Sequence, residues 1–287
     1  MKIKKSKEVI IELMKALSRK EIRKRMSAIP LENIYQLKCN TTTKTSDKGS
    51  NVYYSEVMAE YILGKAKQLQ IIQENNVWKI EPSEGLGYFK DSRTNIIQAP
   101  KDNDGKPHFD RNAETILCRD MYIRCKNGEY FDHIGKILDF QTPLARLRKV
   151  DKAQYKSRKI GKVDLISYSS DERPTIWLLE AKNEKNKESM YRCVMEGFTY
   201  LQTIDKKRYI KELKKLYPQF EIDPSSITFR TAPLIAYEGE QFKEMGEASE
   251  NPKSHEKLIE LMRFLNITFY FSYKIESDKI VIRKHFI

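Results

Sequence analysis

The clearest pattern along the chain is a pair of short apolar runs, at residues 163–166 and 176–181, separated by a polar segment. That segment, residues 169–174, is rich in Ser, Asp and Pro, which are typical of turns, so the two runs are predicted to be neighbouring strands of a hairpin. Side chains alternate between the two faces of a strand. In the second strand, one face should therefore carry Ile176, Leu178, Glu180 and Lys182, and the other Trp177, Leu179 and Ala181.

Further elements follow from the spacing of apolar residues on either side of this hairpin. Helices are predicted over about 55–74, from about 110, over 187–204 and over 257–265, and strands over 131–144, 227–237, 267–275 and 279–286. Residues 40–51 and 238–252 are polar and are expected to form loops. The order of these elements predicts an α/β fold with a mixed β-sheet flanked by helices.

The stretch 81–108, rich in Gly, Pro, Asn and Asp, is the best candidate for a domain boundary. It divides the chain into a basic, mainly helical N-terminal region, 1–95, and an α/β domain, 96–287. Residues 1–48 hold 13 Lys and Arg against 5 Asp and Glu. They are interpreted either as a helical appendage that grips DNA or as a helical brace with a solvated basic face.

The whole chain of 287 residues carries a formal net charge of +13. Such a charge favours an anionic partner, nucleic acid above all, because Lys and Arg neutralise phosphates. A merely basic protein without such a partner is the alternative. The sequence has no run of the length that spans a membrane and no signal-peptide pattern at its N-terminus. The four cysteines lack the spacing of a zinc site and are expected to be free thiols in a cytoplasmic protein.

Charged residues interrupt the two apolar runs. Burying a charged side chain is costly unless the charge is paired or binds a metal. Asp164 lies within the first run, and Glu180 and Lys182 end the second. Here the sequence resembles the PD-(D/E)XK nuclease superfamily, which has the restriction-endonuclease-like fold. Residues 161–165 (GKVDL) are similar to its first strand motif, with Val163 in place of the proline. Residues 180–182 (EAK) are similar to its (D/E)-X-K tripeptide.

The resemblance implies a site for Mg²⁺ or Mn²⁺ formed by Asp164, Glu180 and the backbone carbonyl of Ala181. It further implies that Lys182 acts on the attacking water. Members of the superfamily often carry an acidic residue on the helix before the sheet, and Glu114 fits that place best, ahead of Asp120. Asp139, within the strand predicted over 131–144, is a lesser carboxylate candidate. The alternative is that Glu180 and Lys182 form an ordinary solvated strand end with Asp164 paired to a basic residue, and that Glu114 merely suits the helix dipole.

Residues on the helix that follows the hairpin extend the resemblance. RecB-type members of the superfamily carry Gln-X-X-X-Tyr there, and Glu196 and Tyr200 have the same spacing, with glutamate in place of glutamine. Arg192 lies four residues before Glu196, so the three side chains should share one face of the helix. A plain surface pair between Arg192 and Glu196 is an equally good interpretation.

A basic run leads directly into the strand that carries Asp164. It is interpreted as a phosphate-binding rim of the site, with a solvated loop as the alternative. Its basic residues are Arg146, Arg148, Lys149, Lys152, Lys156, Arg158, Lys159 and Lys162.

Together these features predict a divalent-metal-dependent nuclease that acts on DNA, in restriction, defence, repair or mobile-element biology. A homodimer would suit double-strand cuts, since each chain has one predicted centre. Two alternatives belong to other classes. The first is a non-catalytic nucleic-acid-binding protein that retains the nuclease fold. The second, weaker one is a structural or regulatory protein whose basic faces bind acidic partners.

Overall fold

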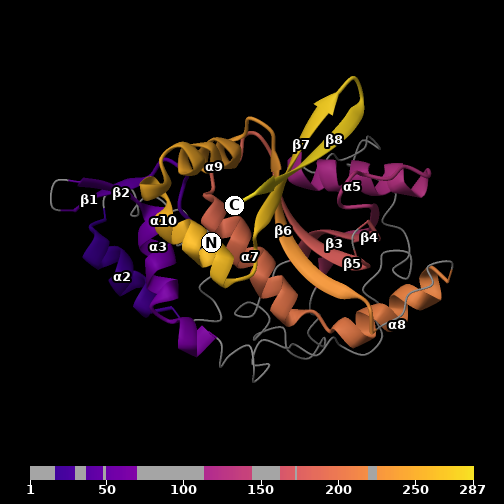
Figure 1. Cartoon of the computed structure of the whole chain (residues 1–287), viewed down its shortest axis with the longest axis horizontal. Coiled ribbons are helices and arrows are strands. Elements are labelled where there is room, and N and C mark those ends of the chain that lie inside the picture. Colours follow the sequence, from indigo (N-terminus) through magenta and orange to yellow (C-terminus); the bar gives the residue numbers. More distant parts are fainter. Residues whose placement is uncertain are drawn as a thin grey trace, which may run out of the picture.

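A computed structural model describes residues 17–29, 37–47, 50–69, 113–143, 162–171, 173–218 and 225–287 of the chain. Within these residues the centre of the molecule is a six-stranded mixed sheet in the order β3-β4-β5-β6-β7-β8 (Figure 1). Helices lie on both faces of this sheet, so the prediction of a mixed sheet flanked by helices is confirmed.

The first half of the sheet contains the predicted hairpin. β3 (Lys136–Pro143), β4 (Lys162–Ser169) and β5 (Thr175–Lys182) pair antiparallel, with Leu165 opposite Leu179 in the β4–β5 ladder. Gly135, just before β3, has a φ of 70°, a left-handed conformation that glycine adopts without strain. The strand predicted over 131–144, with a kink at Gly135, therefore begins only after this glycine, at Lys136.

The second half of the sheet is formed by β6 (Thr228–Ala236), β7 (Phe269–Glu276) and β8 (Lys279–Phe286). β6 runs parallel to both β5 and β7, and β8 returns antiparallel to β7. The β7–β8 hairpin projects beyond the rest of the sheet (Figure 1). All three strands agree with the predicted ones within two residues.

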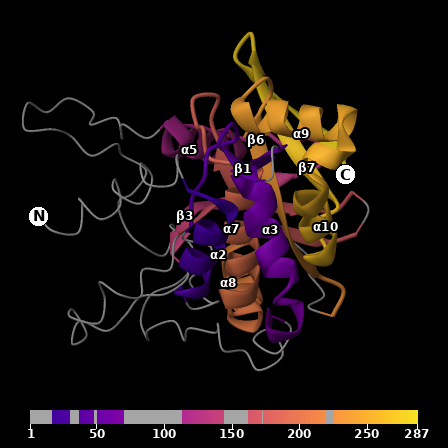
Figure 2. The same cartoon turned by 90° about the vertical axis from the view of Figure 1, so that its left-hand side faces the viewer.

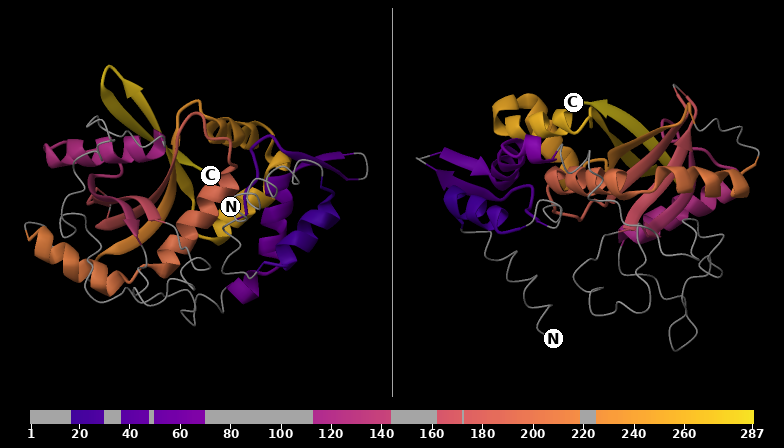
Figure 3. Two further views of the ribbon diagram at one scale, coloured as in Figure 1. Left: turned by 180° about the vertical axis from the view of Figure 1, so that it is seen from behind. Right: turned by 90° about the horizontal axis from the view of Figure 1, so that it is seen from below.

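The two faces of the sheet pack against different helices (Figures 1 and 3). α5 (Ala113–Lys126) covers one face, where it shares a hydrophobic cluster with Trp177, Leu179 and Ala181. α7 (Met190–Thr203) and α8 (Lys206–Leu216) cover the other, where Ile176 and Leu178 are buried. The alternation predicted for β5 is therefore confirmed.

The apolar side that the sequence predicts for this helix, formed by Ala113, Ile116, Leu117, Met121 and Ile123, is correct only in part. Leu117 and Met121 are buried, but Ile116 is 36% exposed, and Ala113 and Ile123 are not buried either. The helix instead buries a stripe displaced around its axis, because Cys118, Tyr122 and Cys125 fill the space over the strands. The sequence also predicts that Asp110 or Asn112 caps the N-terminus of this helix, and both lie outside the described residues.

The described N-terminal residues pack beside the C-terminal helices (Figure 2). They form α2 (Arg19–Ser27), the hairpin of β1 (Lys44–Asp47) and β2 (Ser50–Tyr53), and α3 (Tyr54–Leu63). They share one hydrophobic core with α7, α9 (Glu240–Glu250) and α10 (Glu256–Phe264), which follows the short helix η4 (Pro252–Ser254). The predicted boundary near residue 95 lies outside the described residues.

Two predicted loops in these regions are wrong. Residues 40–51 contain the β1–β2 hairpin, which is held in place in part because the Thr45 hydroxyl donates to the carbonyl of Leu17. Residues 238–252 contain α9, whose apolar residues Met245 and Ala248 are buried at helical spacing among many charged ones. A helix was predicted over 55–74, but α3 ends at Leu63, before Gly64.

Two buried carboxylates connect these helices, each reaching from the side of one helix to the N-terminus of another. Glu56 of α3 accepts hydrogen bonds from the backbone N–H groups of Lys257 and Leu258 at the start of α10, both at 2.8 Å. Glu244 of α9 accepts from the Met190 N–H and the Ser189 hydroxyl at the start of α7, both at 2.7 Å. Each carboxylate supplies acceptors for N–H groups that a helix leaves unpaired.

Two further observations concern the described part of the chain. Its four cysteines are buried thiols. None of its helices combines the length and the apolar character that a membrane span requires.

Candidate functional site

Asp164 and the end of β5 meet where the β4–β5 ladder finishes. The backbone N–H of Ala181 donates to Oδ2 of Asp164 at 3.0 Å, and the Gln141 side chain donates to Oδ1 at 2.6 Å. The Asp164 carboxylate is therefore held against the strand that carries Glu180 and Lys182. The predicted proximity of these three residues is confirmed.

Lys182 lies at the centre of a buried ionic cluster. Its Nζ atom is 2.8 Å from Oε1 of Glu180, 3.4 Å from Oε2 of Glu196 and 3.5 Å from Oε2 of Glu188. Glu180 and Lys182 are each only 4% exposed, which excludes the interpretation as a solvated strand end. Buried charges of this kind must be paired, and here three carboxylates surround one ammonium group.

The charges of the cluster are unbalanced toward the negative. Burial raises the pKa of Asp164 to about 6, against the opposing effects of Lys182 and the Ala181 N–H. Burial, followed by repulsion from Asp164 and Glu196, raises the pKa of Glu180 well above its usual value. Burial opposes the charged form of Lys182, but the charges of Glu180 and Glu196 outweigh it and hold its pKa well above the ordinary range. An additional cation would relieve this repulsion.

Glu114 approaches the same end of the sheet from the first turn of α5. Its Oε1 accepts hydrogen bonds from the side chain of Asn186 at 2.6 Å and from the backbone and side chain of Asn183. Its charge contributes to the raised pKa of Asp164, so the two carboxylates are electrostatic neighbours. The predicted placement of Glu114 beside the strand ends is therefore confirmed.

The lesser acidic candidates have structural partners elsewhere. Asp120 forms an ion pair with Arg124, four residues along α5, at 2.9 Å. Asp139 is fully buried on β3 and accepts a hydrogen bond from the Thr142 hydroxyl at 2.7 Å.

The face of α7 that was predicted from the spacing of Arg192, Glu196 and Tyr200 is turned toward the cluster. Arg192 pairs with Glu196, and both are at least nine-tenths buried, so this is not a surface pair. Tyr200 is buried one turn further on, near enough for the charges of Glu180 and Glu196 to add to the effect of burial in raising its pKa. The prediction that these three residues share one face of the helix is therefore confirmed.

Of the basic run that leads into β4, the structure describes only the last residue, Lys162. Lys162 is exposed at the start of β4, two residues before Asp164. The other basic residues of the run, between 146 and 159, lie outside the described residues.

Several site residues were not predicted from the sequence. Glu188 precedes α7 in a polar segment, and its salt bridge to Lys38 shows that it anchors the N-terminal region as well. Gln141 adopts a left-handed φ of 49° on β3, which no simple sequence pattern reveals. Asn183 and Asn186 follow β5 closely in the sequence. Their position just after a buried strand was the one sequence signal that could have indicated a place in the site.

The donor atoms of the cluster suit a hard divalent cation such as Mg²⁺, which prefers oxygen ligands. Oε2 of Glu180 is buried and has no hydrogen-bond partner among the described residues, which is a costly state for a carboxylate oxygen. Among those same residues, no group of three or more His, Cys, Asp or Glu side chains is arranged to hold a metal ion. The cluster therefore suits a metal in charge and donor type but is not arranged as a set of ligands.

Comparisons of the chain with family models, with curated proteins and with solved structures found no match.

Proposed function

We propose that this chain is a divalent-metal-dependent nuclease with a restriction-endonuclease-like core, and that its substrate is DNA. The observation that carries the proposal is the buried cluster at the ends of β4 and β5. Asp164, Glu180 and Lys182 come together there as the resemblance implies, with Glu114 beside them. Perturbed carboxylates gathered around a lysine are typical of a catalytic site.

Each residue has a role that follows from its chemistry. Asp164, Glu180 and the carbonyl of Ala181 would hold Mg²⁺ or Mn²⁺, with Glu114 completing the shell directly or through water. When bound, the metal would supply a water of lowered pKa and positive charge next to the phosphate. Lys182 would hold the attacking water in line by donating a hydrogen bond, and its charge would offset the negative charge that develops on the phosphate.

Glu196 and Arg192 would act on Lys182 rather than on the substrate. The Glu196 carboxylate contacts both Lys182 and Arg192, so it fixes the position of the ammonium group relative to α7. This arrangement would give the Glu-X-X-X-Tyr segment a positioning role.

DNA is favoured as the substrate by charge. The chain carries a net charge of +13, and its run of basic residues leads into β4 at Lys162, close to the cluster. Basic side chains near a cleavage centre would hold the phosphate backbone on either side of the bond that is cut. A homodimer would place two centres on opposite strands.

A second candidate, a nucleic-acid-binding protein without catalytic activity, is favoured by one observation. Both oxygens of Asp164 accept hydrogen bonds, and Lys182 lies within 3.5 Å of three carboxylates. A network that is already largely satisfied could serve only to hold the fold together. It would leave the basic surface to bind DNA without cutting it.

Cleavage of supercoiled plasmid and of single-stranded DNA, with Mg²⁺, with Mn²⁺ and with EDTA, separates the two candidates. The wild type is compared with Asp164→Asn and with the control Asp120→Asn, which alters a carboxylate on the outer part of α5. Circular dichroism of all three checks the fold. The nuclease proposal predicts metal-dependent cutting that Asp164→Asn abolishes and Asp120→Asn preserves. Salt-sensitive binding without cutting would support the second candidate instead.

A further inference from the structure

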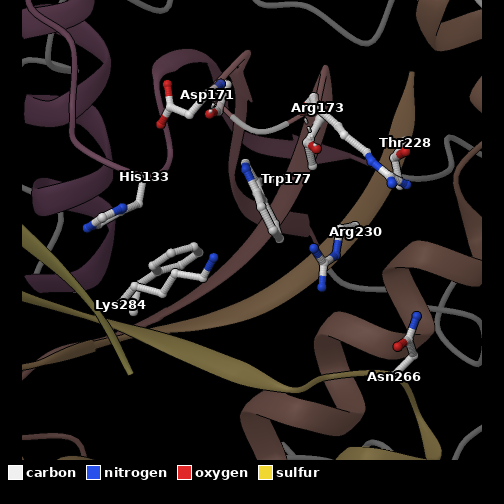
Figure 4. Close-up of a pocket in the computed structure, with 11 residues that line it drawn as sticks. His133, Asp171, Arg173, Trp177, Thr228, Arg230, Asn266 and Lys284 are labelled. Atoms are coloured by element: carbon white, nitrogen blue, oxygen red, sulfur yellow. Dashed lines mark hydrogen bonds between the residues drawn. The ribbon is translucent and has the colours of Figure 1, made fainter. Parts of the chain in front are cut away.

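A pocket of about 430 Å³ opens at the end of β5 opposite the ionic cluster. It lies where the β4–β5 turn, the start of β6 and the β7–β8 hairpin meet (Figure 4). Trp177 stands at its centre, with Arg230 on one side and Lys284 on the other (Figure 4). Its size is within the range of pockets that bind small molecules.

This pocket is distinct from the candidate metal centre. Trp177 precedes Lys182 by five residues, which corresponds to about 17 Å along an extended strand. The Trp177 side chain also points to the opposite face of the sheet, where it packs with the cluster under α5. A ligand in this pocket would therefore not share the carboxylate site.

The charged side chains that line the pocket are mainly cationic. Arg173, Arg230 and Lys284 line it together with a single carboxylate, that of Asp171. Hydroxyl and amide groups, including those of Thr228 and Asn266, complete a lining of hydrogen-bond donors. Arginine and lysine with such donors are the usual partners of a phosphate group.

An aromatic wall adds a second kind of contact. The Arg230 guanidinium lies 5.1 Å from the ring of Trp177 and 4.8 Å from that of Phe269, which holds it beside the pocket by cation–π attraction. Phe271 contacts Trp177 edge to face with ring centroids 5.5 Å apart and also lines the pocket. The wall is thus apolar and lies next to a cationic rim.

The indole N–H of Trp177 is the feature that indicates a ligand most directly. Trp177 is only 5% exposed, and its Nε1 atom has no hydrogen-bond partner among the described residues. A buried donor without an acceptor is unfavourable, and a bound molecule that carries oxygen atoms would supply the acceptor. The orphaned donor, the cationic rim and the pocket's volume point to the same class of ligand.

We propose that this pocket is a second binding site, which takes a nucleotide through its phosphate group. The phosphate contacts Arg173, Arg230 and Lys284, and the remainder of the nucleotide lies against the aromatic wall. The ligand can come from two sources with this same chemistry, a free mononucleotide or the phosphorylated end of a nucleic-acid strand. The site does not depend on the nuclease proposal, because none of its residues belongs to the metal centre.

Trp177 itself reports on the pocket. The chain has two tryptophans, so Trp78→Phe leaves Trp177 as the single indole fluorophore. In this background and in EDTA, the protein is titrated with adenosine monophosphate, adenosine and inorganic phosphate. Two oligonucleotides of one sequence, with a 5′-phosphate and with a 5′-hydroxyl, distinguish the two sources. We expect saturable changes in Trp177 emission with the phosphorylated probes and none with adenosine at the same concentrations.

Variants locate the site. Arg173→Gln and Lys284→Gln should each weaken binding of the phosphorylated probe about tenfold, since each removes a charge-assisted hydrogen bond. Lys253→Gln, an exposed lysine on η4, should leave it unchanged. Circular dichroism confirms that each variant is folded. The proposal is overturned if no phosphorylated probe changes the emission at millimolar concentration, or if the double variant Arg173→Gln/Lys284→Gln binds as the parent does.

Discussion

Oε2 of Glu196 lies 3.4 Å from Nζ of Lys182, so the middle of α7 is connected by an ion pair to the last residue of β5. The same glutamate pairs with Arg192, one turn earlier on the helix. Lys182 is therefore positioned by its strand and by the helix on the α7 face of the sheet. This connection makes the cluster a part of the core as well as the candidate site of chemistry.

Removing Lys182 should leave buried carboxylates without their cation. We expect Lys182→Met to lower the free energy of unfolding by about 3–5 kcal/mol, the usual cost of breaking a buried ion pair on one side. Adding Glu180→Gln to this variant should restore part of the loss, because it removes the charge of the carboxylate that lies nearest to Lys182 Nζ. Urea unfolding of the single and double variants measures this coupling. Equal stability of the two variants would contradict the pairing assigned to Glu180.

α7 and β6 approach each other closely at Gly197. A Cβ atom there would lie 2.3 Å from Oγ1 of Thr231, whose hydroxyl donates to the carbonyl of Leu178 on β5. Gly197→Ala should destabilise the protein by about 1–3 kcal/mol through overpacking. In a Thr231→Ala background the cost should shrink, since the clashing oxygen is absent.

Gly246→Ala is the control for this pair in urea unfolding. A Cβ atom at Gly246 of α9 would have no neighbour within 4 Å, so alanine there should be neutral or slightly stabilising. A cost at Gly197 that is unchanged by Thr231→Ala would mean that the helix is not held by this contact.

Much of the sheet and of the site could be predicted because the relevant signals are local. The run that ends at Glu180 and Lys182 is short and apolar, as buried strands are, and the turn before it is rich in Ser, Asp and Pro. The four-residue spacing from Arg192 to Tyr200 predicted that these side chains share one face of α7. These patterns depend on neighbouring residues only, so they survive in the folded chain.

The features that were missed depend on tertiary contacts. α9 was predicted as a loop because its charged residues outnumber its apolar ones, and Glu244 is buried only because it accepts hydrogen bonds at the start of α7. The β1–β2 hairpin is short and polar, and it is fixed by contacts such as that of Thr45 with Leu17. Contacts between residues that are distant in the sequence produce no periodic pattern of apolar residues around either partner.

Glu244 should make stability depend on pH. Burial raises its pKa from 4.5 to about 7, against the lowering effect of the donors at Met190 and Ser189. A carboxyl whose pKa is raised by folding stabilises the native state fully below about pH 4.5, and this contribution is lost as the pH rises to about 7. The loss is on the order of 3 kcal/mol.

Glu244→Gln should remove this dependence, since the amide can accept from the Met190 N–H and donate to Ser189 while staying neutral. The free energy of unfolding, measured in urea from pH 4.5 to 8, should thus fall in the wild type relative to Glu244→Gln. Glu250→Gln, exposed at the end of the same helix, should keep the wild-type profile. Parallel profiles of wild type and Glu244→Gln would contradict the assignment.

The central claim is that the carboxylates around Lys182 hold a divalent cation, and direct binding of Mn²⁺ tests it. Electron paramagnetic resonance counts the free Mn²⁺ that remains as the protein is added, for the wild type, Asp164→Asn, Glu180→Gln and the control Asp120→Asn. The account predicts one class of sites that both cluster variants lose and Asp120→Asn keeps. Binding should weaken as the pH falls below about 6, where Asp164 becomes protonated. Absence of binding by the wild type at neutral pH, or equal binding by wild type and Asp164→Asn, would contradict it.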